Sequence, residues 1–115
     1  MESILTSIKK LLGPEAEYEH FDPEIIMHIN SVFTILRRMG VGPSTAFRIE
    51  DETSVWTDFV TDIEEIELVK SYVYLKVKLL FDPPLNSAHL NSIKEQIQEF
   101  EWRLNEIADT SNTES

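Results

Sequence analysis

The sequence contains no cysteine, only three glycines and no long hydrophobic run. Without cysteine the chain cannot form a disulfide framework, a thiolate metal site or a cysteine nucleophile. The few glycines form no phosphate-binding loop. No apolar stretch approaches the roughly 20 residues that cross a bilayer. The opening residues also lack the apolar core and the cleavage site of a secretory signal. We therefore expect neither a membrane contact nor a secretory leader.

Basic residues are also scarce, with 10 lysines and arginines against 21 acidic residues and a net charge of -11. No basic stripe is present that would neutralise a phosphate backbone, so specific nucleic-acid binding is not expected. The length of 115 residues predicts one domain whose modest core needs no metal or disulfide. We place this domain at residues 1–108. The polar residues 109–115 are expected to form a disordered tail.

The tripeptide FDP occurs twice, and its first copy predicts a helix start. A helix is expected over residues 22–39, with Asp22 as N-cap and Pro23 as the first helical residue. Its apolar residues recur at helical spacing. Gly40 is the expected left-handed C-cap, with Val41 packing just beyond it.

The second copy, in FDPPLN, predicts a corner between two helices. Proline disfavours helical geometry at the residue before it, so we expect an extended, rigid corner formed by Asp82, Pro83 and Pro84. The next helix is expected to begin at Asn86, whose side chain caps it. Leu85 and Leu90 are then spaced to form a hydrophobic staple.

The helix before this corner, over residues 62–81, is apolar on two opposite sides. A capping box of Thr61 and Glu64 is expected to start it. One side carries Ile63, Ile66, Val69, Val73, Val77 and Leu80, and the other carries Leu68, Tyr72, Leu75 and Leu79. A helix with two apolar sides is expected to be buried on both sides. Either it is the central helix of a bundle, or the second side meets another subunit through Tyr72, Leu75 and Leu79.

The last helix has one regular apolar seam, formed by Leu90, Ile93, Ile97, Phe100, Leu104 and Ile107. This pattern is typical of an antiparallel bundle helix. Trp102 points about 180° away from the seam, because each residue turns the helix by roughly 100°. It is either a partner contact, for which tryptophan is well suited, or it lies flat against the apolar N-terminal segment at residues 4–12.

Residues 42–60 contain glycine, proline, serine and an acidic turn. AFRI and SVWTDF either pair as a short hairpin, or the second forms a helical turn. Trp56 in this segment is a further candidate interface residue. The predicted fold class is therefore mainly all-α: a small bundle of about three long helices, a short N-terminal helix and an irregular loop or hairpin.

The best candidate for a metal site combines His28, four residues after Glu24, with His20 and Asp22 nearby. No metal-binding motif with two histidines at helical spacing is present, which favours a packed or capping histidine. The acids at residues 62–67 spread around a helix axis, as expected for a first helical turn. No catalytic set is evident. We predict no enzyme activity, no metal and no cofactor.

Four stretches together resemble a known family: ILTSIKKLLG, FDPEIIMHINSVFTILRRMGVGP, VKSYVYLKVKLLFDPP and IQEFEWRLN. They resemble the head–tail connector proteins, also called adaptor or head-completion proteins, of long-tailed double-stranded DNA phages. The resemblance spans residues 4–105 and is most specific at LLFDPP and EWRLN. It implies a helical structural protein of the virion neck, made in the bacterial host cytoplasm. Because no residue is catalytic in that family, the resemblance implies no catalytic residue in this chain.

The resemblance also implies partners. Proteins of this family join a ring, commonly of about twelve copies, beneath the portal. The ring extends the DNA channel without binding DNA specifically, and it docks the next neck or tail component. A chain that is monomeric before assembly is compatible with this role. The C-terminal helix with Trp102 would face the portal protein. The alternative is a small acidic regulatory protein that mimics DNA or inhibits a host enzyme.

Overall fold

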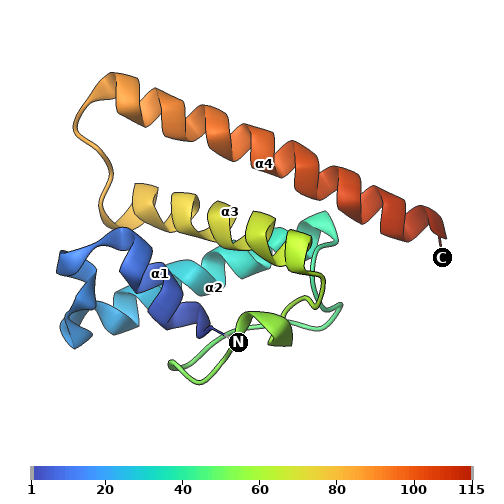
Figure 1. The fold of residues 1–115 in the computed structure, drawn as a ribbon, viewed down its shortest axis with the longest axis horizontal. Helices are drawn as coiled ribbons and strands as arrows, with labels where there is room; N and C mark the ends of the chain where they lie inside the picture. The colour runs from blue at the N-terminus through green and yellow to red at the C-terminus, as the bar shows by residue number, and fades with distance from the viewer. Residues whose placement is uncertain (1, 115) are drawn as a thin grey trace.

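The computed structural model describes residues 2–114, with side chains for residues 2–14 and 16–109. This part of the chain forms four α-helices (Figure 1). They are α1 (Ile4–Leu12), α2 (Asp22–Met39), α3 (Ile63–Phe81) and α4 (Ser87–Glu114), with short 3₁₀ helices at Pro14–Glu17, Glu19–Phe21 and Trp56–Asp58. No β-strand occurs within residues 2–114, where the one β-bridge joins Ser3 to Val55. The all-α prediction is confirmed.

Helix α3 lies at the centre of the molecule, between α1 and α2 on one side and α4 on the other (Figure 1). Its first apolar side buries Ile66, Val69, Val73 and Val77, and its second side buries Tyr72 and Leu75. The two apolar sides therefore reflect cover from two directions within one chain. At the ends of the helix, Ile63 and Leu80 remain exposed.

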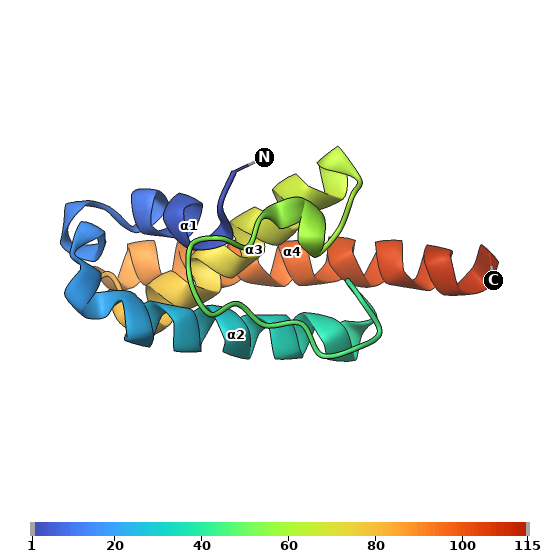
Figure 2. The same cartoon turned by 90° about the horizontal axis from the view of Figure 1, so that it is seen from below.

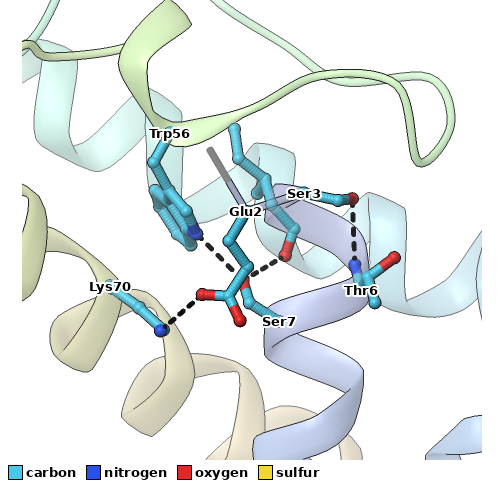
Figure 3. Close-up of polar contacts among 7 residues, drawn as sticks. Glu2, Ser3, Thr6, Ser7, Trp56 and Lys70 are labelled. Atoms are coloured by element: carbon cyan, nitrogen blue, oxygen red, sulfur yellow. Dashed lines mark hydrogen bonds and ion pairs between the residues drawn. The ribbon is translucent and has the colours of Figure 1, made fainter.

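The N-terminal segment is fixed to the irregular segment and to α3. Trp56 donates from Nε1 to the Ser7 hydroxyl at 2.9 Å, and this buried hydroxyl donates to the Ile4 carbonyl at 3.0 Å (Figure 3). Lys70 Nζ reaches the Glu2 carboxylate at 2.7 Å. Four apolar side chains of α1 are buried in the core, namely Ile4, Leu5, Ile8 and Leu12, and Leu11 is exposed.

Residues 42–60 run back along α2 before they turn towards the start of α3 (Figure 2). No hairpin forms, and Trp56–Asp58 makes a 3₁₀ turn instead. The segment is held by its aromatic side chains, because Phe33 of α2 packs against Phe47, Trp56 and Phe59 with ring centroids 4.7–6.4 Å apart. Tertiary packing thus orders a segment whose local sequence specifies no regular element.

Two helix ends have the geometry that their residue types favour. Gly40 adopts the left-handed conformation with φ 90° and ψ 18°. The N–H of Val41 then reaches the Leu36 carbonyl at 2.9 Å, and Val41 is buried. At the start of α4, the Asn86 side chain accepts a hydrogen bond from the His89 N–H at 3.0 Å. Residues 82–86 form the non-helical corner between α3 and α4.

Two expected caps and one expected hydrophobic staple differ from the structure. Asp22 is not the N-cap, because a 3₁₀ turn leads directly into α2 and the Asp22 carboxylate lies 2.8 Å from Lys9 Nζ. Helix α3 is capped by Asp62, which accepts from the Glu65 N–H at 3.0 Å, and not by Thr61. Leu85 is fully exposed and forms no staple.

Helix α4 continues to Glu114, through most of the segment for which composition predicts a disordered tail. No glycine or proline occurs between residues 87 and 114, so the sequence contains no strong stop signal there. The domain limit at residue 108 stays a prediction, and residue 115 lies outside the described part. None of the described helices combines the length and the hydropathy needed to cross a membrane.

Candidate partner-binding surfaces

Most of the predicted interface residues lie within the chain's own core. Trp56, Tyr72 and Leu75 are 1%, 0% and 7% exposed. Leu79 is half-buried against the same core. The chain's own helices and loop already cover Trp56, Tyr72 and Leu75, and Leu79 is covered in part. Contact of the predicted interface residues with a partner stays a prediction, and Trp102 is the one of them whose side chain is largely exposed.

A partly buried hydrogen bond joins α4 to α3. The Tyr72 hydroxyl donates to the Glu101 carboxylate at 2.8 Å. Burial, the hydrogen bond and the negative charge of Glu101 together raise the pKa of Tyr72 well above its ordinary value. The bond stabilises the packing of α4 on α3. Sequence reasoning missed Glu101, although it lies directly beside the seam at Phe100.

Trp102 is the large exposed side chain of α4, with 63% of its surface accessible. It lies opposite the buried seam residues Ile93, Ile97 and Leu104, as its spacing predicts. The alternative in which the N-terminal segment covers it is wrong, because α1 packs on α2 and α3. The nearby Glu99 pairs with Arg103 at 3.0 Å. Trp102 is thus an isolated aromatic side chain on a polar helix face.

A second exposed apolar region lies where α3 ends and the corner begins, and the sequence did not predict it. Tyr18, Leu80 and Leu85 are largely exposed there. Phe21 and Phe81 pack edge to face at 5.4 Å in the same part of the molecule. Tyr18, Phe21 and Phe81 line a shallow pocket of about 270 Å³. Figure 1 shows this corner at the opposite end of the molecule from the C-terminus.

The four side chains of the candidate metal site are engaged with different partners. His28 Nε2 lies 3.7 Å from the Glu24 carboxylate. His20 packs its ring edge to face on Phe21, and Asp22 pairs with Lys9. Among the described residues, no three histidine, aspartate or glutamate side chains lie close enough to hold a metal. These groups have structural contacts, and they do not converge on one point.

The fold defines a small all-α protein whose exposed apolar side chains include Trp102 on α4 and Tyr18, Leu80 and Leu85 near the corner. The sequence profile of the family described as phage connector protein matches residues 4–111. The chain therefore belongs to this family, which confirms the resemblance. No curated protein and no solved structure matches it. Membership implies a structural component of the virion neck that contacts portal and tail proteins.

Proposed function

We propose that this chain is a head–tail connector that assembles as a closed ring beneath the portal. The ring extends the DNA channel and docks the next neck or tail component. The observation that carries the proposal is the family match, which covers α1, α2, α3 and most of α4. The resemblance to the family implies about twelve copies, and any such ring must close by cyclic symmetry.

The distribution of exposed apolar residues supports a ring. A closed ring needs a heterologous interface, in which two different surfaces of one subunit meet. This chain has one exposed apolar region at Trp102 on α4 and another at Tyr18, Leu80 and Leu85 beside the corner. Two separate regions fit a subunit that contacts different neighbours on different sides.

The charge of the chain supports a channel through which DNA passes without binding. With a net charge of -11, an inward-facing surface rich in acids would repel the phosphates of the duplex. An acidic wall neutralises no phosphates and so releases no counterions from the DNA. The duplex would therefore slide past it without binding. A reconstruction of the neck that shows a basic inner wall would contradict this part of the proposal.

The proposal is tested by locating the protein in particles. The chain is tagged, particles are purified from an infected or induced culture, and the tag is located by electron microscopy. The expected result is label at the head–tail junction, together with heads that lose DNA when the gene is deleted. Absence from the particles, with normal virions after deletion, would overturn the proposal and favour the acidic regulatory alternative.

A further inference from the structure

A shallow groove of about 490 Å³ lies between the outer face of α2 and residues 46–48. One wall carries Met27, Asn30 and Thr34, which recur at helical spacing along α2. The other wall is the chain at Phe47 and Arg48, which runs back along α2 (Figure 2). Trp102 does not line this groove, and neither do the exposed residues Tyr18, Leu80 and Leu85.

The side chain of Asn30 acts as a strand partner for the adjacent backbone. Its Nδ2 donates to the Ile49 carbonyl at 3.0 Å, and its Oδ1 accepts from the Ile49 N–H at 2.8 Å. This is the exchange of two hydrogen bonds that one residue makes with its neighbour in an antiparallel ladder. In extended backbone, alternate residues present their N–H and C=O on the same edge, so Phe47 faces the same way as Ile49.

The backbone next to this contact has no partner in the described part of the chain. No hydrogen bond there involves the N–H or C=O of Ala46, Phe47 or Arg48. Unpaired extended backbone is a template for pairing with another chain. Such additions gain affinity from main-chain hydrogen bonds and specificity from pockets for alternate side chains.

The groove has apolar surface for such side chains. Met27 is 58% exposed, and Ile26 is half-buried beside it. The ring of Phe47 is anchored on Phe33 with centroids 5.1 Å apart, so this wall is supported by the core. An incoming extended segment would therefore find both a backbone edge and apolar contacts on a rigid support.

Arg48 is the one cation among the described residues that line the groove, and it indicates the charge of the occupant. Arg48 lines the groove, and Arg37 Nε donates to the Ser44 carbonyl at 3.1 Å, which holds it at the end of the same loop. Neither arginine pairs with a carboxylate of the described chain. Among the other cations of the described chain, Lys9, Lys70, Lys78 and Arg103 do so, whereas Lys10, Arg38, Lys76 and Lys94 do not. An acidic segment is the complementary ligand.

We propose that this groove binds an extended, acidic segment of a partner protein. The segment pairs with the backbone at Phe47, places apolar side chains on Met27 and directs a carboxylate to Arg48. The acidic turn at residues 50–52 lies beyond the other end of the groove, near Pro23, so the carboxylates of the ligand lie towards the C-terminal end of α2. This site goes beyond the ring assignment and does not depend on it.

The test is an NMR titration of the isotope-labelled full chain with a short alternating valine–glutamate peptide. The expected result is saturable shifts at the amides of residues 46–48. A valine–lysine peptide should bind at least about tenfold more weakly, because it places cations against arginine. A valine–glutamate peptide with methylated backbone nitrogens should lose binding to a similar degree, because it cannot donate to the Phe47 carbonyl.

The matched variants are Arg48→Glu and Lys94→Glu, which make the same charge change in the groove and on exposed α4. Arg48→Glu should weaken peptide binding about tenfold, and Lys94→Glu should leave it unchanged. Equal effects of the two variants, equal binding of the control peptides or no saturable shift would each overturn the proposal. Shifts at residues 46–48 that appear on concentrating the chain alone would assign the groove to a second copy instead. If the peptide does not bind but the tagged chain is found at the neck, only this groove site is overturned, and the proposed connector function stands.

Discussion

The two tryptophans of this chain occupy opposite environments. Trp56 is 1% exposed, hydrogen-bonded to Ser7 and packed against Phe33. Trp102 is 63% exposed on the outer face of α4. One stabilises an irregular segment within the core, and the other is available to a partner. The difference shows that residue type alone does not assign a large aromatic side chain to a core or to an interface.

The largest expected effect on stability is that of Trp56→Ala. Removing this buried side chain should lower the free energy of unfolding by about 3–5 kcal/mol, because it leaves a cavity between α1, α2 and residues 42–60. Chemical denaturation monitored by circular dichroism measures the change. A loss below about 1 kcal/mol would show that Trp56 is not a core anchor.

The hydrogen bond of Trp56 is tested by Ser7→Ala, which removes its acceptor with little change of volume. The buried Nε1 then has no partner, and the free energy of unfolding should fall by about 1–3 kcal/mol. The matched control is Ser31→Ala on the exposed face of α2, where the hydroxyl only returns to the Met27 carbonyl. Equal losses in the two variants would contradict a special role for the buried pair.

The packing of α4 on α3 predicts a dependence on alkaline pH. The pKa of Tyr72 is raised in the folded chain, so above about pH 10 the unfolded chain releases this proton first. Stability is fully present below that pH and should fall above it by up to about 1.4 kcal/mol per pH unit. Denaturation at a series of pH values measures the slope. In Tyr72→Phe the slope should be shallower, and an unchanged slope would assign it to other groups.

The smallest expected effect on stability is that of Trp102→Ala. An exposed side chain outside the core should change the free energy of unfolding by no more than about 0.5 kcal/mol. If Trp102 contacts a neighbour in the neck, the same variant should reduce incorporation into particles, which quantitative immunoblotting of purified virions measures. Gln98→Ala, one helical turn away, is the control. Normal incorporation of Trp102→Ala would remove this residue from the proposed interface.

The helix ends show which parts of the fold can be predicted from local sequence. Gly40 and Asn86 adopt the expected roles, because each satisfies backbone groups of its own helix with no distant residue involved. Asp22 does not, because Lys9 from α1 pairs with its carboxylate. An N-cap assignment fails where a tertiary ion pair engages the capping side chain.

The candidate partner-binding surfaces also divide into one that local sequence predicts and one that only tertiary contacts create. The outward position of Trp102 follows from helical spacing alone, and the structure shows the same position. The groove beside α2 has no pattern in the sequence that predicts it. It depends on the contact between Asn30 and Ile49, which lie 19 residues apart.

The sequence by itself determined the all-α class, the positions of α2 and α3, the start of α4, the outward face of Trp102 and the phage connector family. These follow from periodicity, from turn residues and from stretches of residues that carry their meaning locally. Only the tertiary structure decided that α4 covers the second side of α3, that Trp56 is buried and that residues 46–48 leave their backbone unpaired. The physical reason is that an apolar side chain gains by leaving water whichever surface covers it, so its pattern does not specify its neighbour.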